Sequence, residues 1–186
     1  MIIGLTGTIG AGKGTVVQYL KEKGFEHFSA RTLIEEELKK RNLPIDRSHM
    51  ADIGNEIRKK NDAGYIIRTL YDRALSSGKN SIVESVRTPG ELKSLKDKKD
   101  FYLIAVDADI KIRYERIKKR GTSTDNISYE QFVADEEREF SSEDPYAQNI
   151  SACIKMADFN IINNGDIKRM REQVDEILGK IKNNKT

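Results

Sequence analysis

Residues 7–15 read GTIGAGKGT, and they directly follow an apolar run, residues 1–5, that has the length of a buried strand. A helix-forming segment, TVVQYLKEKG, comes next and ends in a glycine. A glycine-rich turn between a strand and a helix directs several backbone N–H groups into one concavity, and Lys13 adds a cation there. The pattern G-x-x-x-x-G-K is specific when a strand and a helix flank it. The stretch therefore predicts a polyphosphate site rather than a glycine turn beside a surface lysine.

One position of this loop departs from the usual pattern. Gly14 follows the lysine where a serine or threonine hydroxyl commonly binds magnesium, and Thr15 comes one residue later. Thr15 is therefore the expected hydroxyl near the metal. The residues expected to contact the nucleotide phosphates are Thr8, Gly10, Ala11, Gly12, Lys13, Gly14 and Thr15.

Length, charge and cysteine content restrict the class of protein. A chain of 186 residues is most simply one domain, and a net charge of +3 from 33 basic and 30 acidic residues argues against a protein that coats nucleic acid. No apolar run has the length of a membrane span or a signal peptide, so we expect a cytoplasmic protein without membrane partners. The sequence leaves the oligomeric state open between a monomer and a weak dimer. Cys153 is the single cysteine, which excludes an intramolecular disulfide and favours a buried, inert thiol.

Short apolar runs alternate with long charged segments of helical spacing. Strands are expected at residues 1–5, 81–85, 101–107 and 159–163, with a weaker one near residues 25–29. This alternation predicts an α/β fold with a mainly parallel five-stranded sheet and helices on both faces. Ligands of such sheets bind at the carboxyl ends of the strands. The residues expected at that edge are Gly7, Glu84, Asp107 and Asn163.

Two segments have the character of insertions. Residues 32–77 are mostly helical and are expected to bind an acceptor, while residues 121–149 are expected to form a lid that excludes water during transfer. The core would then comprise residues 1–31, 78–120 and 150–182. The alternative interpretation of both segments is a pair of solvated helical hairpins, because charged helices are common at protein surfaces.

Several arginines stand where a phosphate would need charge. Arg87 follows the third strand in IVESVRTPGEL, Arg116 and Arg120 lie four residues apart on one helix face, and Arg58 lies in the first insertion. A planar, bidentate guanidinium suits phosphate better than a lysine does. Surface pairing with carboxylates is the alternative for each of them.

The chain resembles P-loop nucleotide kinases over nearly its whole length, between nucleoside monophosphate kinases and dephospho-CoA kinases and closest to a dephospho-CoA-kinase-like group. GLTGTIGAGKGT is similar to the phosphate loops of both families, and IVESVRTPGE resembles the adenylate-kinase segment that carries a carboxylate near magnesium and an arginine on the acceptor phosphate. RIKKR resembles the start of the lid, and ADFNIINNGD the closing strand and loop of dephospho-CoA kinases.

The resemblance implies specific roles. Glu84 would orient a water on magnesium, Arg87 would hold the acceptor, Arg116 would approach the base or ribose, and Arg120 would reach the phosphates. The loop beside the adenine would place Asn164 and Gly165 against the base. The fold implied is of the P-loop NTPase type, with a helical acceptor-binding insert and a lid.

Two departures concern the acceptor and the lid. Adenylate kinases carry an arginine in the first helix of the acceptor subdomain, where SARTLIEEEL has Glu35; Arg31 is the candidate substitute. Asp125 has no arginine beside it, and Ala134 stands where related sequences tend to carry one, which leaves Arg138 as the lid arginine.

These features predict in-line transfer of the ATP γ-phosphoryl group, with Mg²⁺, to a small nucleotide-like acceptor. Lys13, Arg87, Arg116, Arg120 and Arg138 would stabilise the transferring charge. The acceptor favoured by the resemblance is a (deoxy)nucleoside monophosphate, with Arg31, Arg58 and Arg87 as its contacts. For a hydroxyl acceptor, Asp107 or Glu84 would be the first candidates for a base.

Two other functions stay open. One is a dephospho-CoA kinase-like activity, and the other is an ATP- or GTP-binding regulator without a small-molecule acceptor, which a phosphate loop alone does not exclude. A nucleic-acid-end kinase fits less well because the sequence shows no long basic stripe or aromatic stacking platform.

Overall fold

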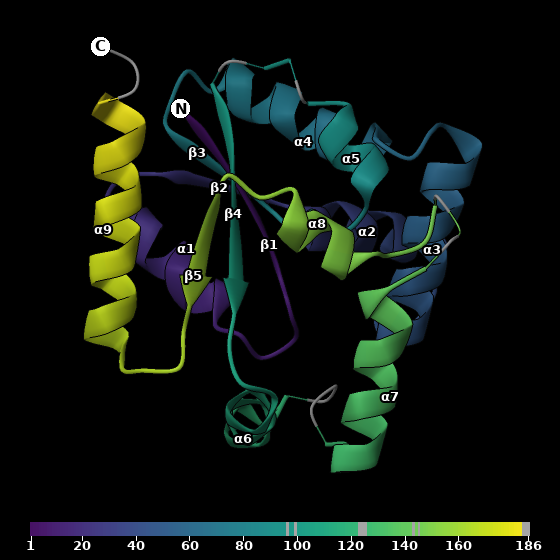
Figure 1. Cartoon of the computed structure of the whole chain (residues 1–186). Helices are drawn as coiled ribbons and strands as arrows, with labels where there is room; N and C mark the ends of the chain where they lie inside the picture. Colours follow the sequence, from purple (N-terminus) through teal and green to yellow (C-terminus); the bar gives the residue numbers. More distant parts are fainter. Residues whose placement is uncertain (96, 99, 123–125, 143, 145, 184–186) are drawn as a thin grey trace.

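The computed structural model describes residues 1–95, 97–98, 100–122, 126–142, 144 and 146–183. Its centre is a five-stranded sheet of order β2-β3-β1-β4-β5 in which every neighbouring pair is parallel. The strands are β1 (Ile2–Gly7), β2 (Glu26–Ser29), β3 (Ser81–Glu84), β4 (Phe101–Asp107) and β5 (Phe159–Ile162). The predicted α/β fold is confirmed, including the weak second strand. Figure 1 shows the sheet at the centre with helices on both sides.

Helices α1 (Lys13–Glu22) and α9 (Ile167–Asn183) cover one face of the sheet. Helix α9 is amphipathic, with apolar residues at helical spacing that form a continuous stripe. This stripe packs with α1 and the inner strands in a core of fully or nearly fully buried residues. The core includes Ile3, Leu5, Val16, Leu20, Ile82, Ile104, Val106, Ile161, Met170, Val174 and Ile181.

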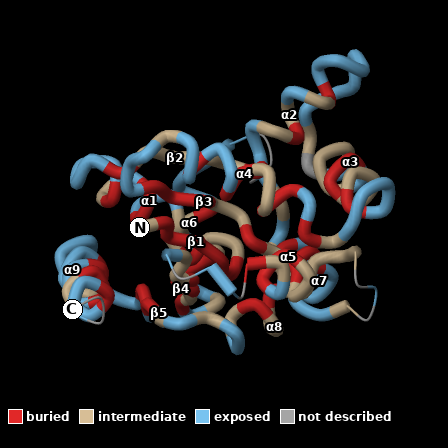
Figure 2. Tube along the Cα trace, turned by 90° about the horizontal axis from the view of Figure 1, so that it is seen from above, coloured by how far each residue is buried: buried red, intermediate tan, exposed pale blue. Residues whose placement is uncertain are grey.

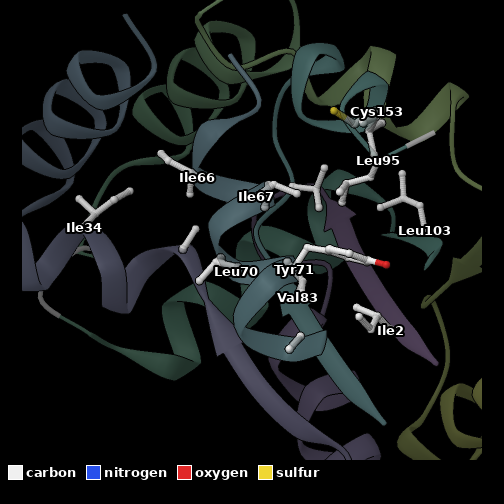
Figure 3. Close-up of a cluster of buried hydrophobic side chains, with 14 of the residues drawn as sticks. Ile2, Ile34, Ile66, Ile67, Leu70, Tyr71, Val83, Leu95, Leu103 and Cys153 are labelled. Carbon is white, nitrogen blue, oxygen red and sulfur yellow. The ribbon is translucent and has the colours of Figure 1, made fainter. Parts of the chain in front are cut away.

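Helices α4 (Tyr65–Ser76), α5 (Pro89–Lys93) and α8 (Ile150–Lys155) cover the opposite face. Figure 3 shows the side chains of this second core converging from α4, the strands and the α8 region. Its members include Ile2, Ile34, Ile66, Ile67, Leu70, Tyr71, Val83, Leu95, Leu103 and Cys153. Cys153 is fully buried, as the sequence predicted, and burial raises the pKa of its thiol to about 12.

Four more helices surround the carboxyl edge of the sheet and one side of the molecule. They are α2 (Ala30–Lys40), α3 (Arg47–Lys60), α6 (Ile110–Arg120) and α7 (Tyr129–Phe140). The far end of α2 stands out from the body, and its turn into α3 is exposed (Figure 2). The segment expected to bind the acceptor, residues 32–77, thus holds α2, α3 and also α4, although α4 packs directly on β2 and β3. In the described part of the chain no helix is long and apolar enough to span a membrane.

Candidate functional site

The strand register brings four polar or glycine positions to the carboxyl edge of the sheet. Gly7 ends β1 and pairs with Val106, Glu84 ends β3 opposite Leu5, and Asp107 ends β4. Asn163 follows β5, and its backbone N–H donates to Asp107 O at 2.8 Å. The edge predicted from the sequence is therefore present, and the glycine-rich loop leaves it between β1 and α1.

Close backbone approaches explain the glycines of this loop. Gly7, Gly10 and Gly12 have φ angles of +136°, +78° and +101°, which side-chain-bearing residues rarely adopt. A Cβ at Gly7 would lie 1.9 Å from Val106 O, and one at Gly12 would lie 2.3 Å from Asn163 Nδ2. A Cβ at Gly14 would meet nothing within 4 Å. The first three glycines are thus required by geometry, whereas Gly14 borders open space.

Side chains from β4 and β5 hold the loop in place. Thr8 Oγ1 donates to Asp107 Oδ1 at 2.6 Å, and Asn163 Nδ2 donates to Ala11 O at 2.8 Å. Thr8 and Ala11 are buried, so neither side chain is accessible for the predicted phosphate contact. The loop is therefore clamped from two neighbouring strands.

The loop opens into a cavity of about 590 Å³ beside the N-terminus of α1. No side chain caps this helix end, and a helix N-terminus attracts anions. The N–H groups of Thr15 and Val16 donate to Gly12 O at 3.0 and 3.2 Å, and Lys13 and Gly14 of the same turn line the cavity. The lining residues are Gly10, Gly12, Lys13, Gly14, Thr15, Glu84, Arg116, Ile117, Arg120, Asn163, Gly165, Ile167 and Met170. The cavity is thus lined by predicted nucleotide-binding residues from the N-terminal loop and by Gly165 near the C-terminus.

Lys13 lies over the start of the loop, where Nζ donates to Gly7 O at 2.8 Å and to Thr8 O at 2.7 Å. Burial of its ammonium group, aided by the charge of Arg87, lowers the pKa of Lys13 to about 8. Glu84 and Glu139 act in the opposite direction but are outweighed. A lysine with so low a pKa in a cleft is a marker of a functional site.

Thr15 and Glu84 line the same cavity, as expected of residues near a magnesium ion. Burial acts to raise the pKa of Glu84, but the hydrogen bond from His27 Nε2 at 2.9 Å and the charges of His27, Lys13 and Arg87 outweigh it and lower that pKa. Glu84 is therefore a carboxylate at neutral pH. No cluster of three or more His, Cys, Asp or Glu ligands occurs among the described residues. The oxygen atoms of Thr15 and Glu84 are ligands of the type that Mg²⁺ prefers.

Apolar side chains and the guanidinium of Arg116 also line the large cavity. Ile117 and Met170 are buried there, and Arg116 Nη2 donates to Gly165 O at 3.4 Å. Arg116 Nη1 is buried and makes no hydrogen bond to any described residue. Asn164 does not line the cavity, and its Oδ1 accepts from Asp109 N at 2.8 Å, which fixes the loop that carries Gly165. An apolar wall with a few polar groups is the usual composition of a base-binding site.

Lys13 also lines a second, small cavity of about 20 Å³. Arg87 enters it from the loop after β3, where Ser85 has a φ of +77°, a strained conformation for this residue. Arg87 Nη1 donates to Gln148 Oε1 at 2.6 Å and to Glu139 Oε2 at 3.4 Å. The lining residues are Thr6, Gly7, Ile9, Lys13, Ser85, Val86, Arg87, Glu139 and Ile150.

The structure does not bring Arg58 to either cavity. Its side chain is 4% exposed, and its Nε and Nη2 donate to Glu91 Oε1 at 3.1 and 3.0 Å. Glu91 is fully buried, and its other oxygen accepts from the backbone N–H groups of Arg87 and Thr88. Arg58 thus connects α3 with the loop that carries Arg87, which is a structural position rather than contact with an acceptor.

Two other predicted arginines also lie outside both cavities. Arg31 pairs with Glu35 at 2.6 Å and Arg138 pairs with Asp135 at 3.8 Å, and the two arginine side chains are 60% and 63% exposed. Asp125, the other lid position that the sequence raised, falls outside the described residues.

Sequence reasoning missed Arg113, Glu139 and His27. Arg113 is buried and donates to Ile9 O in the phosphate loop and to Ala108 O after β4. Glu139 lies seven residues after Phe132, so helical spacing places both on the buried face of α7. The sequence alone therefore contained a sign that Glu139 faces inward. His27 lay in a strand that the sequence indicated only weakly, so its pairing with Glu84 had no signal of its own.

A sequence model described as an AAA domain matches residues 3–143. The chain belongs to this AAA-domain family. A UPF0200 protein of Methanocaldococcus jannaschii is 30% identical over 99% of this chain and 92% of its own length, which shows membership of the UPF0200 family as well.

Solved structures of kinases share the fold of this chain. Shikimate kinase of Aquifex aeolicus is 16% identical with a TM-score of 0.54, and 99% of this chain and 98% of that chain are covered. A gluconokinase of Sinorhizobium meliloti is 9% identical with a TM-score of 0.60, with 98% and 93% covered. The suspected P-loop kinase resemblance is confirmed at the level of fold.

Proposed function

We propose that this protein is an ATP-dependent phosphotransferase that moves the γ-phosphoryl group to a small, nucleotide-like acceptor. The observation that carries the proposal is that Lys13 lines two unequal cavities, one of about 590 Å³ and one of about 20 Å³. The larger one has the loop amides, an apolar end and two arginines, which suits a nucleoside triphosphate. The smaller one, beside Arg87, stands where an acceptor would meet the γ-phosphate.

The donor would lie with its phosphates along the loop. The N–H groups at the start of α1 and the Lys13 ammonium would bind the β- and γ-phosphates, with Arg120 beside them. Arg116 and Gly165 would face the base and ribose, where Arg116 Nη1 is buried without a hydrogen bond to a described residue. Binding of a triphosphate would favour the charged form of Lys13 and so offset the effect of burial on its pKa.

Thr15 and Glu84 would hold magnesium, Glu84 through water. The bound ion would neutralise charge on the β- and γ-phosphates and fix their orientation for in-line attack. Gly14 supplies no hydroxyl, so the protein would contribute fewer direct ligands than loops with a serine or threonine at that position. His27 would keep Glu84 ionised and oriented by its hydrogen bond.

The fold relatives act on acceptors whose nature their names state, shikimate and gluconate-type substrates, and both are small hydroxylated molecules. This supports a small-molecule acceptor for the present protein as well. A regulator that binds ATP or GTP without an acceptor is the other candidate, but such a protein has no need for Arg87 or for a second cavity beside Lys13.

The test compares Lys13→Met with Lys21→Met, an exposed lysine later on the same helix. ADP release from Mg-ATP would be measured with and without a panel of nucleoside monophosphates, nucleosides and dephospho-CoA. Removal of a charged group that stabilises the transferring phosphoryl group costs about 10²–10³-fold in turnover, and Lys21→Met should match wild type. Equal turnover in Lys13→Met would refute the proposal, and acceptor-independent, slow hydrolysis in wild type would favour the regulator.

A further inference from the structure

Arg87 is held by its backbone as well as by its side chain. Its N–H donates to Glu91 Oε2 at 2.7 Å, and its carbonyl oxygen accepts from Asn149 N at 2.8 Å. Ser85, two residues earlier, has a φ of +77°, a conformation that persists only where the surrounding structure imposes it. The turn that brings Arg87 to the small cavity therefore depends on contacts with other parts of the chain, and Glu91 supplies one of them.

The two oxygens of the Glu91 carboxylate have different partners. Oε2 accepts from the backbone N–H groups of Arg87 and Thr88 at 2.7 and 3.0 Å. Oε1 accepts from Nε and Nη2 of Arg58 at 3.1 and 3.0 Å. Glu91 is fully buried, and a carboxylate in a protein interior needs a charged partner to offset its loss of hydration. The Arg58 guanidinium thus makes it possible for a buried carboxylate to bind the backbone at Arg87.

This guanidinium belongs to the segment that is expected to bind the acceptor. Arg58 lies in the last turn of α3, and its Nη1 donates to Asn55 Oδ1 of the same helix at 3.4 Å. Its other two guanidinium nitrogens bind Glu91, so the group is held both by its own helix and by α5. The position of α3 is in this way linked to the backbone position of Arg87.

Close backbone packing joins the same two parts of the chain. A Cβ at Gly90 in α5 would lie 2.5 Å from Ala63 Cβ, and a Cβ at Gly64 would lie 2.7 Å from Ser94 Oγ. Ala63 and Gly64 follow α3, whereas Gly90 and Ser94 lie within and directly after α5. Side-chain-bearing residues would not fit at these two glycines without a shift of their neighbours. The contact between the end of the acceptor segment and α5 is therefore tight, and α5 begins two residues after Arg87.

We propose that Arg58 and Glu91 are positioning residues, which hold the Arg87 guanidinium where it meets the acceptor and the γ-phosphate. This inference rests on the phosphotransferase function proposed above. Neither Arg58 nor Glu91 lines either of the two cavities, so they act on the reaction through Arg87. The acceptor segment thus contributes to transfer in a second way, because its helix α3 fixes an arginine that lies outside the segment.

A positioning role and a purely structural role differ in their dependence on Arg87. If the buried pair only stabilises the fold, its disruption lowers activity equally in wild type and in an Arg87→Met variant. If the pair positions Arg87, its disruption lowers activity only while the guanidinium is present. A double-mutant cycle measures this difference, because substitutions that act on one shared group are not additive.

The cycle consists of wild type, Arg58→Lys, Arg87→Met and the double variant. Arg58→Lys retains the charge but lacks the planar group that binds Glu91 through two nitrogens. ADP release from Mg-ATP is measured with water as the acceptor, and again with adenosine monophosphate, deoxycytidine monophosphate and dephospho-CoA. We expect kcat to fall about 10²-fold in Arg58→Lys, the effect of a small misplacement of a reacting group, with a KM for ATP within about threefold of wild type. In the Arg87→Met background, the same substitution should change kcat by less than about twofold.

A second arm observes Arg87 without any turnover. Arg87 Nη1 donates to Gln148 Oε1 at 2.6 Å, so the side-chain amide signals of Gln148 in nitrogen-15 NMR spectra report the place of the guanidinium. These signals should shift in Arg58→Lys toward their positions in Arg87→Met. The control is Glu56→Gln, two residues earlier on α3, which breaks exposed pairs with Arg41 and Lys60 and should leave both kcat and the Gln148 signals unchanged.

The outcomes separate this inference from the proposed function. An equal fall in kcat in both backgrounds, or Gln148 signals that stay at their wild-type positions in Arg58→Lys, would overturn the inference and leave the phosphotransferase function intact. Absence of any ADP release by wild type would refute that function and with it the role of the pair in transfer. If Arg58→Lys melts below the assay temperature, Glu91→Gln, which keeps the shape of the side chain, takes its place with the same expected results.

Discussion

The two cavities that Lys13 lines, to which the proposed function assigns the donor and the acceptor, are built by different means. The proposed donor side is made of backbone: glycines with positive φ and the start of a helix border a cavity of about 590 Å³. The cavity of about 20 Å³ is bordered by charged side chains, Arg87 from the loop after β3 and Glu139 from α7. The buried Arg58–Glu91 pair connects α3 with the loop that carries Arg87. A backbone site tolerates few local substitutions, whereas a side-chain site depends on pairs of residues far apart in sequence.

The largest effect is expected on stability, at the acceptor side. Arg58→Met leaves the fully buried Glu91 carboxylate without its guanidinium partner, and removal of one partner of a buried ion pair costs about 3–5 kcal/mol. Arg31→Met, which breaks the exposed pair with Glu35, should cost under about 1 kcal/mol. Urea denaturation of the two variants measures this difference. Equal midpoints would mean that the Arg58–Glu91 pair does not hold α3 against the loop.

The donor side is tested by two glycines two residues apart. Gly12→Ala places a Cβ 2.3 Å from Asn163 Nδ2 at a φ of +101°, and a strained backbone conformation of this kind costs about 1–3 kcal/mol. We therefore expect Mg-ATP affinity to fall by about 5–150-fold. Gly14→Ala meets nothing within 4 Å and should bind within about twofold of wild type. Isothermal titration calorimetry measures the Mg-ATP affinity of both variants. If Gly14→Ala bound Mg-ATP as weakly as Gly12→Ala, this result would contradict the geometry of the loop.

The smallest effect is expected in the pH dependence of ATP binding. This measurement probes Lys13, the residue that lines both cavities. Lys13, whose pKa is about 8, is charged below that pH and loses its proton above it. Bound phosphates favour the charged form and raise the pKa, so affinity is fully present below about pH 8 and falls above it, by at most about tenfold per pH unit. Titrations from pH 7 to 9.5 should show this fall in wild type and lose it in Lys13→Met. A flat wild-type profile would mean that Lys13 does not contact the phosphates.

The contrast between a cavity built from backbone and one built from side chains also explains how much of the site could be predicted from the sequence. The strands, the loop and the edge that carries Gly7, Glu84 and Asp107 follow from local patterns, since strand length, glycine spacing and parallel order are properties of short segments. The sequence also indicated Arg87 and Glu84 from their place at a strand end. These positions need no knowledge of distant partners.

The acceptor side was less accessible to prediction for a physical reason. Arg58 was predicted to contact an acceptor, but its partner Glu91 lies 33 residues away in the sequence, and only the tertiary fold brings the two side chains together. Glu139 meets Arg87 across 52 residues and was not predicted at all. Charged residues are common on helices, so a sequence does not reveal which of them the fold buries.

The central claim is that the loop amides and the Lys13 ammonium bind the tail of a nucleoside triphosphate. It is tested most directly by calorimetric titration of Mg-ATP, and of Mg-GTP, into the folded wild-type protein. The account predicts saturable heat with one site per chain for at least one of the two nucleotides. A folded protein that gives no binding heat with either nucleotide would contradict it.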